Sequence, residues 1–366
     1  MKIVSVLGAR PQFVKAAPVS RVLRQRHDEV LVHTGQHYDD AMSAAFFRDL
    51  DLPPPDHDLG VGSGTHAIQT AEMLRQLEPL LSAEAPDAVL VYGDTNSTLA
   101  GALAAAKLVD GAGKRPWLAH VEAGLRSFNP SMPEERNRIV ADHLSDLLLA
   151  PTPAAMANLA REGLAERATV VGDVMVDAFM VASSRADDFL PPVAQAQPYL
   201  LLTLHRPSNV DDPARLGAWL EAVAEQAGPA LFPVHPRTRA VLAAAEVPIP
   251  ASVTLLEPVG YLAMVALERA ARVIATDSGG VQKEAYLAGV PCVTLRAETE
   301  WTETLEAGWN RLCPEPSNAP SAIAAADEVD RSASRPPLFG DGHAAERIVE
   351  ALERLTAGRA AALVAS

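Results

Sequence analysis

Three carboxylates stand where the chain leaves an apolar run or a turn, at positions that often serve in catalysis. Asp94 follows the apolar run 88–93, Glu122 follows the apolar run 117–121, and Glu134 comes directly after a Met-Pro pair. We expect the first two at strand ends and the third at the start of a helix. Ligands of open α/β sheets bind at the carboxyl ends of the strands. The three acids therefore indicate proton transfer to and from a bound substrate.

Each acid also has a structural alternative. Asp94 could cap the helix that follows it. Glu122 could form an ion pair with Arg126, and Glu134 could be a first-turn acid that the helix dipole favours. No single acid decides between a structural and a catalytic role, but the three together favour proton-transfer chemistry.

Residues typical of an anion site occur in the second half of the chain. Ser278, Gly279 and Gly280 follow an apolar strand and open a helix, whose backbone N–H groups can hold phosphate. Glu284, about one turn into that helix, can accept hydrogen bonds from ribose hydroxyls. A plain capped helix is the alternative, although two successive glycines let a ligand approach closely. His205, at another strand end, either faces a ligand or is an ordinary turn histidine.

A second anion site is predicted near the amino terminus. Arg10 and Lys15 are expected in the first turns of a helix that begins after Gly8. Cations there oppose the helix dipole, which favours an anion site over a solvated basic turn. Gln36 and His37, after the next strand, indicate either a ligand loop or a plain turn.

Short apolar strands alternate with helical stretches, which predicts parallel sheets with helices on both faces. Strands are expected over 2–7, 29–34, 88–92, 117–121, 147–151, 199–204, 230–234, 253–256, 273–275 and 291–294, and helices over 13–26, 66–82, 98–109, 134–145 and 343–360. The regular pattern weakens near 170–197. We therefore expect an α/β fold of two Rossmann-like domains with parallel sheets facing a central cleft, the GT-B type.

Each expected domain contributes different residues to the site. Residues 1–170 carry the catalytic carboxylates, residues 171–342 form the nucleotide-binding domain, and 343–366 hold a C-terminal helix that could pack back on the N-terminal domain or on the other half. The glycine-rich loop 58–65 is not a dinucleotide fingerprint, because Thr65 occupies the place of its third glycine.

Composition excludes several function classes. The 366 residues are 48% hydrophobic and 21% charged with a net charge of −15, which argues against nucleic-acid and membrane partners. Cys292 and Cys313 are the only cysteines, so we expect no disulfide scaffold and no metal site, and a cytoplasmic location fits. The amino terminus reads as a strand rather than a signal peptide, and no apolar run approaches the ~20 residues of a membrane span.

Six motifs carry a family resemblance. They are 8–15, 34–37, 93–98, 120–126, 133–138 and 276–284. In this order they resemble the non-hydrolysing UDP-N-acetylglucosamine 2-epimerase family, from residue 1 to about residue 312. The resemblance implies interconversion of UDP-GlcNAc and UDP-ManNAc by anti elimination of UDP to 2-acetamidoglucal and re-addition. It also implies a homodimer that needs no cofactor.

The resemblance assigns a role to each candidate residue. Asp94, Glu122 and Glu134 are the acid/base and positioning carboxylates, and which of them removes the C2 proton stays open. His205 lies by the diphosphate, Arg10 and Lys15 stabilise the charge of UDP, Ser278, Gly279 and Gly280 bind phosphate, Glu284 binds ribose, and 257–261 lies near uracil; Gln36, His37 and Arg206 are candidates for an allosteric or sugar pocket.

Two departures from the family leave the exact sugar open. Trp301 stands where better-known bacterial relatives have an Arg near the diphosphate, and Ser208 where Glu is common. The segment 298–301 is also similar to relatives that act on UDP-2,3-diacetamido-2,3-dideoxyglucuronic acid. The same chemistry on that sugar, a GT-B glycosyltransferase, a hydrolysing epimerase and a non-catalytic sugar-nucleotide sensor are the alternatives.

Overall fold

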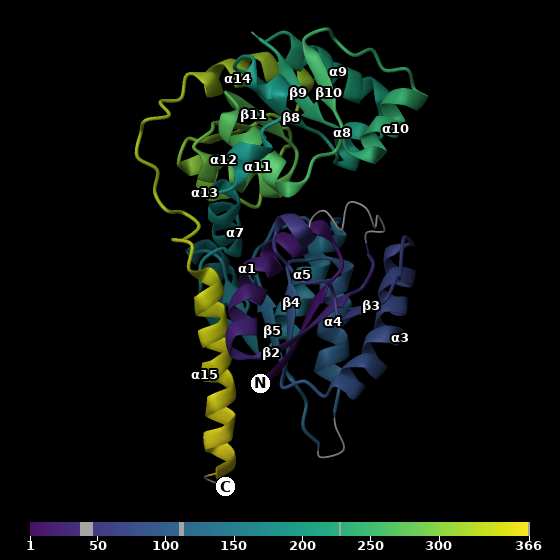
Figure 1. Cartoon of the computed structure of the whole chain (residues 1–366), viewed down its shortest axis with the longest axis vertical. Coiled ribbons are helices and arrows are strands. Elements are labelled where there is room, and N and C mark those ends of the chain that lie inside the picture. Colours follow the sequence, from purple (N-terminus) through teal and green to yellow (C-terminus); the bar gives the residue numbers. More distant parts are fainter. Residues whose placement is uncertain (37–46, 110–112, 227, 365–366) are drawn as a thin grey trace. The chain divides into compact units, whose positions relative to one another are not determined.

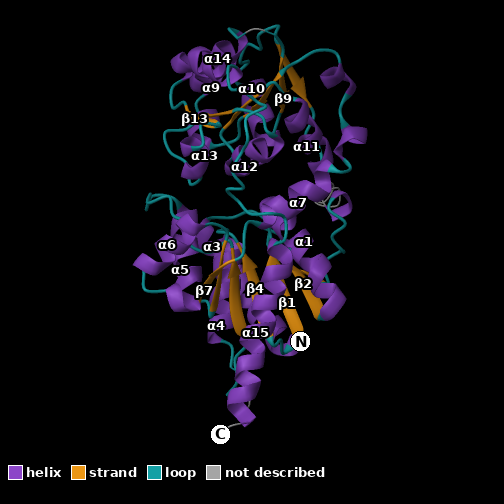
Figure 2. Ribbon diagram, turned by 90° about the vertical axis from the view of Figure 1, so that its left-hand side faces the viewer, coloured by secondary structure: helices purple, strands orange, loops and turns teal. Residues whose placement is uncertain are grey.

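The chain divides into two compact units. The computed structural model describes residues 1–36, 47–109, 113–226 and 228–364. Unit 1 comprises Met1–Met180 and Phe339–Ser366, and unit 2 comprises Val181–Leu338. Each unit has a sheet flanked by helices (Figures 1 and 2). The chain first passes from unit 1 to unit 2 inside α7 (Val174–Ser183).

Unit 1 is built on a parallel sheet of seven strands in the order β3-β2-β1-β4-β5-β6-β7. The strands are β1 (Lys2–Leu7), β2 (Asp28–His33), β3 (His57–Asp58), β4 (Ala88–Tyr92), β5 (Trp117–Val121), β6 (Leu147–Ala150) and β7 (Ala168–Val170). The strand order reverses between β1 and β4. The carboxyl ends of these strands therefore form a switch point, where open α/β sheets bind ligands.

Helices cover both faces of this sheet. They are α1 (Arg10–Arg26), α3 (His66–Glu84), α4 (Asn96–Lys107), α5 (Pro133–Leu144), α6 (Pro153–Arg161), α7 and α15 (Ala344–Val364). Apolar side chains of α3, α4 and α5 pack with those of the central strands in one core. Helix α15 packs against α1, β5 and β6. Asp177 of α7 fixes its start by accepting hydrogen bonds from the N–H groups of Ala344 (3.2 Å) and Ala345 (2.9 Å).

Unit 2 repeats the design with a parallel sheet of six strands in the order β10-β9-β8-β11-β12-β13. The strands are β8 (Leu200–Thr203), β9 (Ala230–Pro233), β10 (Val253–Leu256), β11 (Val273–Thr276), β12 (Cys292–Thr294) and β13 (Asn310–Leu312), and the helices are α8 (Pro207–Val210), α9 (Pro213–Ala224), α10 (Pro236–Ala244), α11 (Tyr261–Ala270), α12 (Gly279–Ala288), α13 (Thr302–Glu306) and α14 (Ala319–Asp327). Its switch point lies between β8 and β11, next to the predicted phosphate seat.

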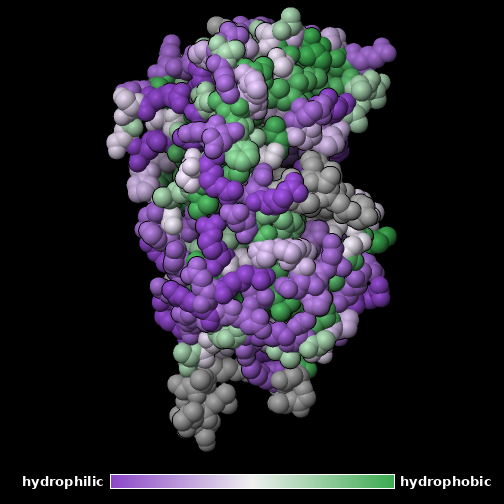
Figure 3. All heavy atoms as spheres, in the orientation of Figure 1, coloured by the Kyte–Doolittle hydropathy of each residue, from purple (hydrophilic) through white to green (hydrophobic). Residues whose placement is uncertain are grey.

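The two cores of unit 2 lie on opposite faces of its sheet. One contains side chains of α9, α10 and α14, and the other side chains of α11 and α12. Figure 3 shows mostly hydrophilic side chains on this face of unit 1, as expected for helices that turn their apolar sides to a sheet, whereas unit 2 also shows groups of hydrophobic side chains.

The expected α/β class with two parallel-sheet domains is confirmed. Strands β3, β7 and β13 were not predicted, because two or three residues are too few to show a periodicity. Within the described ranges, no helix is long and apolar enough to cross a membrane, and no acidic, His or Cys side chains gather as a metal site would require. Cys292 and Cys313 are buried and unpaired.

Candidate active site

Asp94 lies in the turn after β4 and forms an ion pair with Arg138 of α5. The capping alternative is wrong, because Thr95 caps α4 with its hydroxyl accepting the Thr98 N–H (3.4 Å). The Arg138 side chain is only 5% exposed, whereas that of Asp94 is 31% exposed. Asn137 also donates to the backbone oxygen of Asp94 (2.9 Å). A buried cation therefore holds a carboxylate that solvent can still reach.

Glu122 follows β5 and pairs with Lys15 of α1. The alternative pairing with Arg126 is wrong, because Arg126 instead contacts Asp142 (2.8 Å) and Glu162 (2.7 Å). Both members of the Lys15–Glu122 pair are largely buried. Glu122 has a φ of 70°, in the left-handed region, which costs a non-glycine residue ~1–2 kcal/mol. Such strain is typical of functional positions that the surrounding fold holds in place.

Gly93 packs directly against this ion pair. It has a φ of 62°, and a Cβ on it would lie 3.0 Å from Lys15 Nζ and 3.2 Å from Glu122 Oε2. The next residue in the chain is Asp94. The neighbouring ends of β4 and β5 therefore bring two of the three predicted carboxylates together in unit 1.

A buried histidine supports this turn from behind. His120 of β5 has Nε2 2.6 Å from the Gly93 oxygen and Nδ1 2.7 Å from Asp142 Oδ1. Both side chains are completely buried. Burial opposes ionisation of Asp142, but its bonds with His120 and Arg126 outweigh this and hold its pKa below the usual value. A single His within an apolar strand was the only signal of this network in the sequence.

Glu134 and Glu135 are adjacent in the first turn of α5 but have opposite surroundings. Glu135 is buried and accepts hydrogen bonds from Ser127 N–H (2.9 Å), Ser127 Oγ (3.0 Å) and Phe128 N–H (2.9 Å). Its carboxylate also lies 3.2 Å from Arg138. Glu134 is half-buried and makes no hydrogen bond or ion pair with the described part of the chain. Glu134 is therefore the carboxylate left available to a ligand.

The other predicted site residues of unit 1 are Arg10, Lys15, Gln36 and His37. Arg10 is the half-buried first residue of α1, and Lys15 forms an ion pair with Glu122. Their role in binding an anion stays a prediction. Gln36 Oε1 accepts hydrogen bonds from Ser97 N–H (3.0 Å) and Ser97 Oγ (2.7 Å). Gln36 thus provides an acceptor for a backbone N–H group in the first turn of α4. His37 lies outside the described residues. The predicted pocket of Gln36, His37 and Arg206 stays a prediction.

In unit 2, buried Asp277 organises the turn after β8. It accepts hydrogen bonds from the N–H groups of His205 (3.1 Å) and Arg206 (2.9 Å) and from Asn209 Nδ2 (3.2 Å). Burial alone would raise the pKa of Asp277. The hydrogen bond with the His205 ring, together with those from Arg206 N–H and Asn209, outweighs burial and lowers this pKa. His205 Nδ1 lies 3.0 Å from this carboxylate, and the His205 side chain is 42% exposed. The ring is thus anchored through Nδ1, and Nε2 is left to a ligand.

The start of α12 offers backbone N–H groups to an anion. Ser278 is the N-cap residue without a side-chain cap, and Gly279 and Gly280 are half-buried. A Cβ at either glycine would meet no neighbouring atom closer than 3.6 Å. The packing of the protein itself therefore does not require glycine here, which favours close approach by a ligand. Glu284, further along the helix, is buried.

A cation that the sequence analysis missed lies beside this helix start. Lys283 Nζ is 3.9 Å from the centre of the Trp301 ring, and Trp301 Nε1 lies 3.6 Å from the Cβ position of Gly279. Both side chains are buried. Lys283 therefore supplies a positive charge beside Trp301 and the start of α12.

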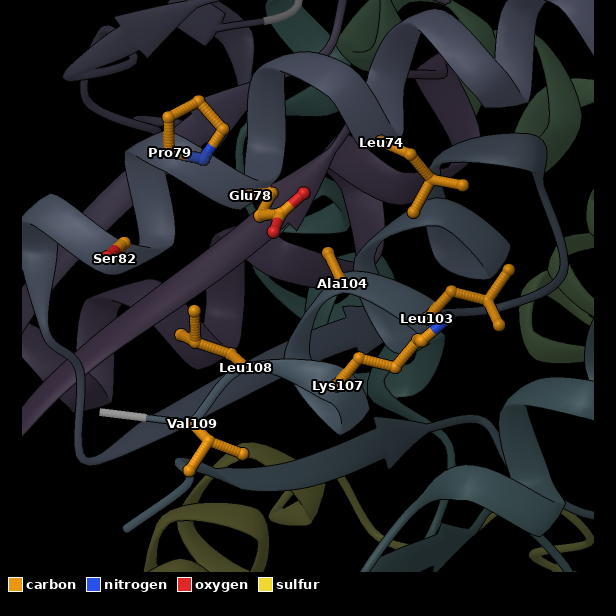
Figure 4. Close-up of a pocket in the computed structure, with 9 residues that line it drawn as sticks. All are labelled: Leu74, Glu78, Pro79, Ser82, Leu103, Ala104, Lys107, Leu108 and Val109. Carbon is orange, nitrogen blue, oxygen red and sulfur yellow. The ribbon is translucent and has the colours of Figure 1, made fainter. Parts of the chain in front are cut away.

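One hollow of about 840 Å³ in unit 1 lies away from these residues, between α3 and α4. It is lined by Leu74, Glu78, Pro79, Ser82, Leu103, Ala104, Lys107, Leu108 and Val109 (Figure 4). No predicted site residue lines it, and it has no convergent set of acids. We therefore assign the chemistry to the strand ends and not to this hollow.

The family model and the relatives with high sequence identity carry the names of UDP-sugar 2-epimerases. The profile of a family described as UDP-N-acetylglucosamine 2-epimerase matches residues 21–353. A UDP-N-acetylglucosamine 2-epimerase homolog of Methanococcus maripaludis is 45% identical over 97% of this chain and 100% of that protein. The UDP-2,3-diacetamido-2,3-dideoxy-D-glucuronate 2-epimerase of Pseudomonas aeruginosa is 44% identical over 97% and 100% of the two chains.

Solved structures are similar along the same length. The crystal structure of Methanocaldococcus jannaschii UDP-GlcNAc 2-epimerase in complex with UDP-GlcNAc and UDP has a TM-score of 0.88 and 41% identity, over 97% of this chain and 100% of that chain. The calicheamicin glycosyltransferase CalG4 has a TM-score of 0.56 and 16% identity, over 96% and 98% of the two chains. At that identity CalG4 shares the GT-B fold alone.

Proposed function

Because the chain belongs to the UDP-N-acetylglucosamine 2-epimerase family, whose members are isomerases, we propose that it interconverts UDP-GlcNAc and UDP-ManNAc. The reaction proceeds by anti elimination of UDP to 2-acetamidoglucal and re-addition. The observation that carries this proposal is the arrangement of the three carboxylates in unit 1. Asp94 and Glu122 are each held by a cation, and Glu134 has no partner in the described part of the chain.

The difference in surroundings gives the carboxylates different roles. The cations beside Asp94 and Glu122 engage the carboxylate oxygens of these residues, whereas no cation in the described part of the chain engages Glu134. Glu134, which lacks such a cation, takes the C2 proton. As the C2–H electrons form the C1–C2 double bond, the bond from C1 to the phosphate oxygen breaks and its electrons leave with UDP. Asp94 or Glu122, after taking up a proton from solvent, donates it to C2 on the opposite face, where the electrons of the C1–C2 double bond form the new C2–H bond. A phosphate oxygen of UDP then adds back at C1, and Glu134 releases its proton to solvent.

The departing UDP gains a negative charge, which groups of unit 2 stabilise. The backbone N–H groups of Gly279 and Gly280, in the first turn of α12, provide fixed donors. His205, anchored by Asp277, presents Nε2 to the diphosphate, and Lys283 adds a cation. Preorganised donors of this kind stabilise developing charge in a transition state. The carboxylates of unit 1 and the anion seat of unit 2 thus supply the two halves of the elimination.

Incubation with UDP-GlcNAc in D₂O tests the proposal. Proton NMR should show deuterium at C2 of both epimers, and Glu134→Gln should slow this exchange. Turnover that leaves C2 undeuterated, as in a glycosyltransferase, would refute the proposal. Release of free ManNAc and UDP would instead show a hydrolysing epimerase. Binding without any turnover, unchanged in Asp94→Asn, would show a sugar-nucleotide sensor.

A second candidate substrate is UDP-2,3-diacetamido-2,3-dideoxyglucuronic acid. The Pseudomonas aeruginosa relative that is 44% identical carries the name of this activity, and Trp301 departs from the bacterial UDP-GlcNAc pattern. A panel of the two sugars, followed by NMR, compares kcat/KM directly. If neither sugar yields a 2-epimer, the proposed reaction is refuted.

We also propose that the protein acts as a homodimer in the cytoplasm, as the family resemblance implies. Two buried, unpaired cysteines fit a reducing compartment. Light scattering after size exclusion tests the oligomeric state, and a mass of one chain at micromolar concentration would refute the dimer.

A further inference from the structure

A second acid lies buried beside the predicted ribose-binding glutamate. Glu268 of α11 is 0% exposed, and α11 packs against α12, which carries Glu284. The two carboxyl groups are close enough to share a hydrogen bond. Two ionised carboxylates cannot remain in such contact without a proton between them, because their repulsion in a buried place is strong.

Other groups around Glu268 do not supply that proton. Neither Glu268 oxygen accepts a hydrogen bond from an N–H or O–H group in the described ranges. The Tyr199 hydroxyl donates instead to the Leu267 oxygen (2.7 Å). The Cys292 thiol is completely buried, which, with Glu268 nearby, raises its pKa to about 12. An ionised carboxylate in these surroundings would lose its hydration without compensation.

Glu268 is therefore neutral in the folded protein. Burial, together with the charge of Glu284, holds the pKa of Glu268 well above its usual value. A neutral carboxyl group has one O–H to donate, and Glu284 is the carboxylate in reach.

We propose that Glu268 is a positioning residue, whose proton bonds to the ionised Glu284 carboxylate and fixes that group in the orientation that binds the ribose diol. The proposal rests on the proposed function and on the ribose-binding role of Glu284 that the family resemblance implies. A carboxylate that accepts from two vicinal hydroxyls must be held in one plane, and fixing it beforehand lowers the entropy cost of binding. The expected result is a preference for UDP over ligands that lack the ribose hydroxyls.

Calorimetric titration with UDP and with 2′,3′-dideoxy-UDP tests this role. Glu268→Gln keeps a neutral donor and should change UDP affinity by less than about threefold. Glu268→Leu removes the donor and should weaken UDP binding about tenfold, the worth of one hydrogen bond, with dideoxy-UDP unaffected. Replacement of a buried acid by an apolar residue need not destabilise the fold. An unchanged ratio of the two affinities in Glu268→Leu would overturn the proposal.

The variant Glu284→Ala tests the role of Glu284 in binding ribose separately from the role of Glu268 in positioning it. This variant should lose the preference for UDP over dideoxy-UDP. If it keeps the preference, Glu284 does not bind ribose, and the role of Glu284 that the resemblance implies is wrong whatever Glu268 does.

Infrared spectroscopy at neutral pH tests the protonation without any ligand. The full chain should show the C=O band of a protonated carboxyl group, and Glu268→Gln should lose it. Glu29→Gln is the matched control, because buried Glu29 accepts from Ser5 Oγ (2.7 Å) and pairs with Arg24 (2.9 Å), which keeps it ionised. A band that survives in Glu268→Gln would overturn the proposal.

Discussion

The adjacent glutamates at the start of α5 allow a direct test of the proposed proton transfer. Glu134→Gln removes a charge from a half-buried side chain without a partner in the described part of the chain. We expect the free energy of unfolding to change by less than about 0.5 kcal/mol. The rate of C2 deuterium exchange should fall by ~10²–10⁴, the usual contribution of a positioned acid or base.

Glu135→Gln makes the same chemical change one residue later, with the opposite expected result. One Glu135 oxygen accepts from Ser127 N–H and Oγ, and the other from Phe128 N–H. An amide keeps only one acceptor oxygen and turns its NH₂ group toward a donor. A hydrogen bond to a charged group contributes about 1.5–3 kcal/mol, and Arg138 loses one carboxylate. We therefore expect a loss of about 2–4 kcal/mol.

Urea unfolding and C2 exchange, measured on both variants, separate the two roles. Stability should fall only in Glu135→Gln, whereas Glu134→Gln should lose exchange at native stability. If Glu134→Gln exchanges C2 at the native rate, Glu134 is not the base. If the variant unfolds at a clearly lower urea concentration, its assignment as an unpartnered side chain is wrong.

Three further variants probe the groups around the site. Gly93→Ala should lose about 1–2 kcal/mol because it places a Cβ at positive φ, 3.0 Å from Lys15 Nζ; an unchanged melting temperature would contradict this. Asp142 has a lowered pKa in the folded state, so its contribution is present above its unfolded value near 3.8 and is lost as pH falls through the lower folded value. Asp142→Asn should therefore lower the free energy of unfolding by ~3–5 kcal/mol at pH 7. The urea midpoint of this variant should also fall less steeply at acid pH than that of the unchanged protein. Equal falls of the two midpoints would refute the lowered pKa of Asp142. Lys283→Met should weaken UDP binding about tenfold and reduce its salt dependence, and calorimetry at two salt concentrations that shows equal salt dependence would exclude a phosphate role.

Much of the fold was predictable because buried parallel strands are continuous apolar runs. The bounds of β4 (Ala88–Tyr92) and β5 (Trp117–Val121) agree with the predicted ranges, and the positions of Asp94 and Glu122 follow from them. The two-residue strand β3 gave no such signal.

The partners of the site residues were not predictable from local patterns. Lys15 and Glu122 are 107 residues apart in sequence, and only the parallel arrangement of the strands brings them together. The sequence offered Arg126 as the nearer partner for Glu122, but Arg126 instead pairs with buried Asp142 and with partly exposed Glu162. Glu268 was missed for a related reason, because nothing in the apolar pattern of a helix shows that its one buried acid faces another.

The first unit is discontinuous in the chain, and this imposes an order on biosynthesis. Helix α15 of unit 1 is synthesised only after all of unit 2 has been synthesised. Ile348, Val349 and Leu352 of α15 are completely buried, so the surface that receives them stays uncovered until then. Unit 2 is one uninterrupted segment, so its folding does not depend on a segment that is synthesised later. A premature stop before α15 would therefore leave unit 2 able to fold and unit 1 with an open apolar face, a substrate for chaperones and proteases.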